Sequence, residues 1–180
     1  LIRLMDTLDD MWQQSGVIHR DLKPDNIFMA AAEKEEAKYL DGSLITENEY
    51  GIRVALSDFG TAKHLSIPGG VQAMTNVTGG SATIGTMVFM PPEQIYGAAT
   101  VASDVFATGV IFYLLCTDGK YFPFADEDPA KKVFFPLTRE KLAKNMQQFT
   151  DEQLGRLNSF FTAVLAQKPE RRFQEEIPSW

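Results

Sequence analysis

Residues His19-Arg20-Asp21-Leu22-Lys23-Pro24-Asp25-Asn26 are the stretch of sequence that decides the fold. The stretch is polar, and it lies between two short apolar segments, Val17-Ile18 and Ile27-Phe28-Met29. The second of these segments is typical of a short strand. The eight residues are therefore predicted to form a loop that presents several ionisable side chains beside a strand.

The chain on either side of this loop predicts a helix before it and a second strand after it. Apolar residues at helical spacing mark the helix, which Gly16 is expected to end; they are Leu1, Leu4, Met5, Leu8, Met11 and Trp12. Residues 52–56 alternate and predict a strand that pairs with the first one. Between the strands, residues from about 30 to 49 are Ala-rich and charged, with six acidic residues against two lysines, which predicts a surface insertion at the hairpin tip. This insertion is either simply solvated or a docking site for a partner.

The second half of the chain predicts a long loop followed by helices. Residues 66–85 are rich in Gly, Ser and Thr, and a loop of this length inside a domain is usually functional or disordered. Residues 105–116 are apolar nearly all round, which predicts a central buried helix with Cys116 in the core. Two amphipathic helices are expected next, one over about 139–149 and one with Thr150 as its N-cap. The second has an apolar stripe and is expected to stop at Lys168-Pro169; the stripe is Leu154, Leu157, Phe160, Phe161, Val164 and Leu165.

Composition bounds the possible functions. The chain has 180 residues, which suits one domain or a large lobe of one. Its formal net charge of -7 argues against a nucleic-acid-binding surface, which needs clustered Lys and Arg. One cysteine excludes an internal disulfide framework and a cysteine-based metal site, and it fits a reducing compartment. No apolar run is long enough to span a membrane, so a cytoplasmic location is the default expectation.

Further motifs follow the polar loop in a fixed order. Asp58-Phe59-Gly60 comes first, and then Gly85-Thr86 precedes Pro91-Pro92-Glu93. Asp104 opens the run that leads to Gly109, and Pro169 precedes Arg172 by three positions. In this order the motifs resemble those of the protein kinase family, and the lysine two residues after Asp21 resembles the Ser/Thr kinases. The resemblance covers nearly the whole chain except the insertion.

This resemblance implies a fold and a domain organisation. We expect a mainly α (α+β) structure, namely a protein-kinase-like C-terminal lobe with a small β-hairpin. Residues 1–180 are then a partial kinase domain, with a catalytic loop at 19–26, the insertion at about 30–49 and an activation segment at 58–93. In the family, the Gly-rich loop, the strand lysine and the helix glutamate precede these motifs, and we expect them to lie before Leu1. The N-terminal lobe is therefore expected to be absent from this chain.

The resemblance also assigns roles in ATP-dependent transfer of a phosphoryl group to a protein hydroxyl. Asp21 is expected to accept the proton of the substrate hydroxyl, and Lys23 to contact ATP and offset charge on the transferred phosphate. Asn26 and Asp58 are expected to hold Mg²⁺, a hard cation that prefers oxygen ligands. Thr86 is expected to pack against Asp21 and Lys23. The implied cofactors are ATP and Mg²⁺, and the implied partners are a protein substrate and the missing N-terminal lobe.

Other family positions are expected to support the fold or its regulation. Glu93 is expected to pair with Arg172 and brace the activation segment, and Asp104 to hydrogen-bond the backbone of the catalytic loop. Arg20 precedes Asp21, as in kinases switched on by phosphorylation of the activation segment. A phosphate there would offer strong acceptors to Arg20; the candidate sites are Thr75, Thr78, Ser81 and Thr83.

Three functions stay open at this point. The first is a Ser/Thr kinase, inactive as this fragment alone because half of the ATP pocket is missing. The second is a pseudokinase or scaffold lobe that binds partners, which would not need the metal ligands Asn26 and Asp58. The third is a small-molecule phosphotransferase with a related fold, which would typically lack the segment from Gly85 to Glu93. Phe89 stands where the family commonly has Tyr, so the peptide preference is left open.

Overall fold

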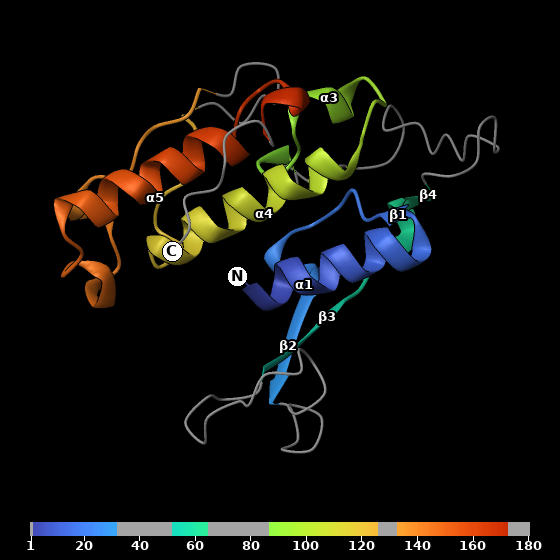
Figure 1. Cartoon of the computed structure of the whole chain (residues 1–180), viewed down its shortest axis with the longest axis horizontal. Coiled ribbons are helices and arrows are strands. Elements are labelled where there is room, and N and C mark those ends of the chain that lie inside the picture. The colour runs from blue at the N-terminus through green and yellow to red at the C-terminus, as the bar shows by residue number, and fades with distance from the viewer. Residues whose placement is uncertain (1, 32–51, 65–86, 126–132, 173–180) are drawn as a thin grey trace.

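The computed structural model of the chain describes residues 2–31, 52–64, 87–125 and 133–172. The long helix α4 (Val101–Cys116) lies between α1 (Ile2–Asp10) and α5 (Asp151–Val164) in Figure 1. The short helix α3 (Pro92–Ile95) precedes α4. Two small two-stranded sheets complete the fold, β1–β4 and β2–β3, and β2–β3 extends away from the helices. The predicted insertion falls mostly at 32–51 and the predicted long loop at 65–86, so both lie largely outside the described residues.

Helix α1 ends as the sequence predicts but with an unexpected turn. Beyond Asp10 the chain widens into a π-helical segment, Met11–Ser15. Gly16 then adopts a left-handed conformation with φ 60°, and its amide donates to the carbonyl of Trp12 at 3.1 Å. This conformation costs glycine little because it has no Cβ. The chain can therefore turn directly from the π-helical segment into strand β1.

The predicted hairpin is confirmed, and a second strand pair accompanies it. Strand β2 (Ile27–Ala31) pairs antiparallel with β3 (Ile52–Leu56), with Ile27 opposite Leu56. Strand β1 (Val17–Ile18) pairs with β4 (Lys63–His64), which the sequence did not indicate because two residues are too short for a periodic pattern. The two pairs hold loop 19–26 and the segment 57–62 between them. The residues predicted to carry the chemistry are thus close in space.

Helix α4 forms the centre of the core. The helix is buried over most of its length, as its all-round apolar sequence predicts. It begins at a capping box in which the backbone amide of Thr100 donates to Oγ of Ser103 at 3.0 Å. Gly109 lets α5 pack closely, because a Cβ at this position would lie 2.7 Å from Cγ2 of Val164. Helix α5 begins at the predicted Thr150 cap, whose Oγ1 accepts the Gln153 amide at 3.2 Å.

The predicted helix over about 139–149 is wrong. The structure has two 3₁₀ turns there, Arg139–Lys141 and Lys144–Met146, separated by extended backbone at Leu142 and Ala143. The Ala143 amide donates to the carbonyl of Cys116 at 2.8 Å, which ties this segment to the end of α4. In a continuous helix, that amide would instead donate to a carbonyl within the helix. A tertiary hydrogen bond therefore overrides the amphipathic pattern.

Cys116 is predicted to be unreactive in the folded protein. Its side chain is fully buried, and burial raises the pKa of the thiol to about 12. At pH 8 on the order of one thiol in 10,000 is then ionised, and reagents cannot reach it. We expect iodoacetamide to leave Cys116 unmodified in the native protein and to alkylate it in 6 M guanidinium, as read by peptide mass spectrometry. Rapid native labelling would show that the end of α4 is not packed as described.

Among the described residues, no helix is both long enough and apolar enough to cross a bilayer.

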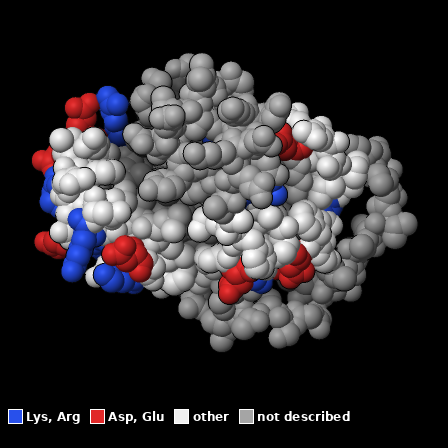
Figure 2. Space-filling model, turned by 90° about the horizontal axis from the view of Figure 1, so that it is seen from below, with Lys and Arg blue, Asp and Glu red and all other residues white. Residues whose placement is uncertain are grey.

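The described surface carries charges of both signs. Two exposed ion pairs, Arg139–Asp151 at 2.5 Å and Arg156–Glu152 at 2.9 Å, lie at the start of α5. On the face that Figure 2 shows, acidic and basic side chains are interspersed and do not gather into one basic patch.

Candidate active site

Two polar side chains of loop 19–26, those of Lys23 and Asn26, contact the carboxylate of Asp21. The Lys23 ammonium lies 2.8 Å from Oδ2 of Asp21. The Asn26 amide donates to the backbone carbonyl of Asp21 at 2.8 Å and to its Oδ2 at 3.2 Å. Pro24 begins a 3₁₀ turn that ends at Asn26 and folds that side chain back onto Asp21. The Asp21 side chain stays 14% exposed, so the carboxylate is held in place and still reachable from solvent.

Asp104 of α4 holds the backbone just before Asp21. Its Oδ2 accepts the His19 amide at 2.8 Å, and its Oδ1 accepts the Arg20 amide at 2.9 Å. The Trp12 indole N–H also donates to Oδ2, at 3.2 Å. Arg20 has φ 71°, a left-handed conformation that costs a non-glycine residue on the order of 1–3 kcal/mol. The two charge-assisted hydrogen bonds from the backbone help to maintain this strained conformation.

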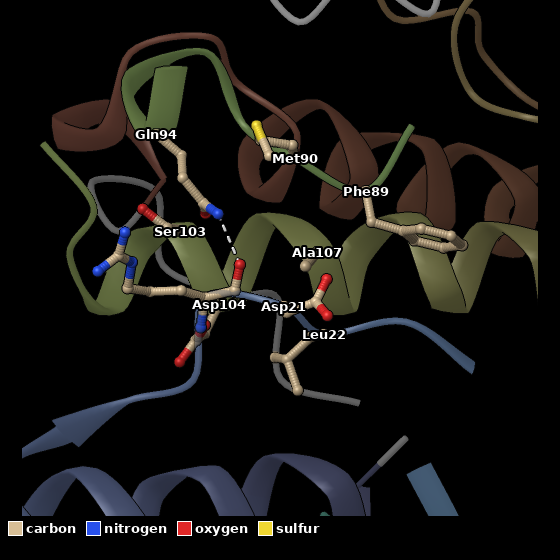
Figure 3. A pocket seen from close by; sticks show the side chains of 9 residues that line it. Asp21, Leu22, Phe89, Met90, Gln94, Ser103, Asp104 and Ala107 are labelled. Atoms are coloured by element: carbon tan, nitrogen blue, oxygen red, sulfur yellow. Dashed lines mark hydrogen bonds between the residues drawn. The ribbon is translucent and has the colours of Figure 1, made fainter. Parts of the chain in front are cut away.

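Further contacts fix the same backbone from other sides. The Gln94 side chain reaches from α3 and donates to the Arg20 carbonyl at 2.6 Å, the dashed line in Figure 3. His19 is fully buried, and its Nε2 lies 2.8 Å from the carbonyl of Ser57. The hydroxyl of Thr61 donates to the His19 carbonyl at 3.2 Å. Loop 19–26 is therefore held from α3, from α4 and from the segment after β3.

The carboxylate of Asp104 is predicted to be important for stability. Burial raises the pKa of Asp104, while hydrogen bonds from Arg20, His19 and Trp12 oppose the rise. Asp104→Asn places an NH₂ group against at least one backbone N–H, leaving that donor unpaired. We expect the free energy of unfolding to fall by about 1–3 kcal/mol, measured by urea unfolding. Asp9→Asn, on the exposed surface of α1, is the matched control and should change it by less than about 0.5 kcal/mol.

Asp58 lies next to Asn26 through the hairpin register. The Ser57 amide donates to the Asn26 carbonyl at 3.0 Å, and Asp58 is the following residue. Asp58 is exposed and adopts a left-handed conformation with φ 62°. The Phe59 ring beside it packs against the His19 ring at a centroid distance of 4.8 Å. One exposed carboxylate and one amide side chain thus come from neighbouring segments, a donor set suited to a hard cation.

A small cavity lies beneath the loop, behind Asp21. Its volume is about 10 Å³, space for roughly one water molecule. Figure 3 shows Asp104 and Ala107 of α4 on one side of it, Gln94 and Met90 on the other, and Asp21 at the end. A nucleotide or peptide cannot enter a space of this size. The cavity therefore holds at most about one water molecule, and Asp21 is reached from its solvent-exposed side.

Glu93 and Arg172 form a buried bidentate ion pair. The two guanidinium NH₂ groups lie 2.6 Å from Oε1 and 2.9 Å from Oε2 of Glu93. The same arginine donates to three backbone carbonyls at 2.8–3.2 Å; they belong to Ala166, Ala102 and Gln167. Its guanidinium also lies over the Phe106 ring at 4.7 Å. This pair joins α3 to Arg172, the last residue that the structure describes.

Several predicted residues fall outside the described part of the chain. Thr86 and the four candidate phosphorylation sites, Thr75, Thr78, Ser81 and Thr83, lie in 65–86. Arg20, which was expected to bind such a phosphate, is half-buried. Its Nε is buried and has no hydrogen-bond partner among the residues that the structure describes.

The structure adds site residues that the sequence did not indicate. Gln94 and Trp12 contact the loop or its support from 74 and 92 positions away in the chain. Ser103 donates to Oε1 of Glu93 at 2.7 Å. The Thr100-x-x-Ser103 spacing is a capping signal that could have located Ser103. No local pattern distinguishes Gln94 or Trp12 from ordinary surface or core residues.

Comparison with known proteins identifies relatives of the whole described region. The family model described as protein kinase domain matches residues 2–176. The serine/threonine-protein kinase PknB of Mycobacterium leprae is 30% identical over 162 residues, which are 89% of this chain and 21% of the relative. PknB of Mycobacterium tuberculosis is 28% identical with the same coverage. The serine/threonine-protein kinase PknD of Chlamydia abortus is 34% identical over 122 residues, 67% of this chain and 12% of the relative.

The chain therefore spans about a fifth of the length of the PknB proteins that it matches. The family model, in contrast, accounts for almost all of the chain itself. On this match, the chain belongs to the protein kinase family.

Proposed function

We propose that this chain is the C-terminal lobe of an ATP-dependent protein serine/threonine kinase. The observation that carries the proposal is that Lys23 and Asn26 both contact Asp21, at distances of 2.8–3.2 Å. A phosphoryl acceptor needs a base close to a cation, held in fixed positions. Relatives named serine/threonine-protein kinases support the same reaction class.

In the proposed reaction the hydroxyl oxygen of a Ser or Thr side chain forms a bond to the γ-phosphorus of ATP. The bond between that phosphorus and the β–γ bridging oxygen breaks, and ADP leaves. Asp21 accepts the proton of the attacking hydroxyl. Lys23, 2.8 Å from Asp21, offsets the charge on the transferred group. Both side chains are partly exposed, which lets a substrate reach them.

Asn26 and Asp58 are the residues that would hold Mg²⁺. Mg²⁺ usually takes one or two protein oxygens and completes its shell with water and nucleotide phosphates. The exposed carboxylate of Asp58 and the amide of Asn26 fit this requirement, and the Ser57–Asn26 backbone hydrogen bond keeps their segments together. When bound, the ion would neutralise phosphate charge and orient the phosphates for transfer.

A second lobe is part of the proposal. Three apolar side chains close in sequence to the candidate site residues are exposed: Met29 is 74%, Phe28 57% and Phe59 48% exposed. Phe28 and Met29 follow each other in β2 and so lie on opposite faces of the hairpin, and Phe59 follows Asp58 directly. We take these exposed apolar side chains as candidate contacts for a further part of the protein. We propose that a lobe with the Gly-rich loop and strand lysine typical of the family covers this region. The chain alone is then expected to lack kinase activity.

Regulation by phosphorylation is also proposed. Thr75, Thr78, Ser81 and Thr83 are the candidate sites, and Arg20 is the residue that would bind the phosphate. The buried Nε of Arg20, unpaired among the residues described, supports a role for this side chain beyond packing. Phosphopeptide mass spectrometry of the active complete protein should find at least one of the four sites modified. Activity with all four unmodified would contradict the proposal.

The proposed function is tested by phosphoryl transfer in the complete protein that carries this chain. Purified protein is incubated with [γ-³²P]ATP, Mg²⁺ and a general protein substrate, and the labelled protein is hydrolysed for phosphoamino acid analysis. Phosphoserine or phosphothreonine that disappears in Asp58→Ala supports the proposal. Label transferred only to small molecules favours a small-molecule phosphotransferase. Nucleotide binding without any phosphoryl transfer favours the hypothesis of a pseudokinase or scaffold.

A further inference from the structure

Trp12 is the only aromatic side chain that the described structure places in a hydrogen bond with Asp104. Its indole N–H lies 3.2 Å from Oδ2, the same oxygen that accepts the His19 amide at 2.8 Å. Trp12 comes from the other side of the loop, 92 positions away from Asp104 in the chain. A single carboxylate therefore links the π-helical segment Met11–Ser15, α4 and loop 19–26.

The backbone at Trp12 is unusual and is adapted to this contact. Trp12 belongs to the π-helical segment Met11–Ser15, which departs from the regular helix α1 immediately before it. Such π-helical turns are rare and often occur at functional sites. The Trp12 carbonyl accepts the amide of Gly16, which closes the turn, and two residues lie between Gly16 and loop 19–26. The side chain is partly buried and packs against the hydrophobic core, so the indole has both a packing contact and a hydrogen bond.

We propose that Trp12 is a positioning residue for phosphoryl transfer, acting through its indole N–H on Asp104. The donor fixes the orientation in which Asp104 accepts both the His19 and Arg20 amides. Those amides hold Arg20 in its left-handed conformation, φ 71°, and Asp21 follows immediately. Loss of the donor lets the carboxylate turn and moves Asp21 relative to its substrate. This inference rests on the proposed kinase function, because it assigns Trp12 a part in that reaction.

Two replacements separate the hydrogen bond from packing. Trp12→His keeps a five-membered ring with an N–H at nearly the same distance from Cβ, and it removes the six-membered ring. Trp12→Phe keeps a six-membered aromatic ring and removes the N–H donor. If packing is what matters, Phe is the milder change because it fills more space. If the donor matters, His is the milder change.

The first measurement is hydrogen exchange at the amides of His19 and Arg20 in the complete protein. We expect faster exchange in Trp12→Phe and near wild-type exchange in Trp12→His. The second is steady-state kinetics, where Trp12→Phe should lower kcat about 10- to 100-fold with little change in the KM for ATP. Trp12→His should recover most of that loss.

Equal exchange in all three proteins, or Trp12→His as impaired as Trp12→Phe, would overturn the inference. Altered exchange with an unchanged kcat would overturn it too, because Trp12 would then be structural only. A wild-type protein without phosphoryl transfer would refute the proposed function and, with it, the positioning role. The exchange comparison would in that case still decide whether the indole holds the loop, so the two failures are distinguishable.

Discussion

Replacement of Asp21 by asparagine in the complete protein is expected to lower kcat for phosphoryl transfer by about 100- to 10,000-fold. Asparagine keeps the shape of the side chain and can still accept the hydrogen bond from Lys23, now 2.8 Å from Oδ2. It cannot take a proton from the attacking hydroxyl. The KM for ATP should stay within about twofold, because the proposed metal ligands are Asn26 and Asp58.

Asp25→Asn is the matched control for this experiment. Asp25 lies in the same loop, four positions after Asp21, and the substitution removes the same charge. Its side chain is exposed on the 3₁₀ turn Pro24–Asn26, and no role in the reaction is proposed for it. We expect its kcat to stay within about twofold of the wild type. Equal losses in both variants would show that the net charge of the loop matters and that Asp21 is not the base.

The elements that the sequence predicts correctly are those with a strong local pattern. Strand β3 alternates, α4 is apolar all round, and α5 begins at a capping box; each signal lies within the element itself. The segment 139–149 had a helical pattern too, yet its Ala143 amide bonds to Cys116 at the end of α4. Tertiary hydrogen bonds of this kind cannot be read from one stretch of sequence. The same limit explains why the two-residue strands β1 and β4 were not expected.

In the candidate site, too, the residues that a local motif contains were predicted, and those brought in by tertiary packing were not. Asp21, Lys23 and Asn26 lie within six residues, so a short motif was enough to bring them together as candidates. Gln94 contacts the loop from α3, and Trp12 contacts Asp104, the support of the loop, from the π-helical segment; their own neighbours in the sequence carry no signal. Asp104 was indicated by family resemblance, but its contact with Trp12 depends on a π-helical turn that no propensity predicts.

Removal of the Arg172 side chain is expected to have the largest effect on stability. Arg172→Met should lower the free energy of unfolding by about 3–5 kcal/mol, because it leaves the Glu93 carboxylate buried without its cation. The Arg172 side chain is 0% exposed and that of Glu93 only 9%. The three backbone carbonyls that Arg172 serves would lose their donor as well. Such a loss is a large share of the total stability of a typical domain, about 5–15 kcal/mol.

The neighbouring Arg171 provides the matched control, because it is exposed and Arg171→Met removes the same charge one position away. Its effect in urea unfolding should be below about 0.5 kcal/mol. The double variant Glu93→Gln with Arg172→Met separates pairing from burial. If the cost comes from an unpaired buried carboxylate, the double variant will be more stable than Arg172→Met alone, since the stranded charge is gone. If the double variant instead loses as much free energy of unfolding as the two single variants together, Glu93 and Arg172 do not stabilise each other. The stability would then come from the contacts of Arg172 with the backbone carbonyls.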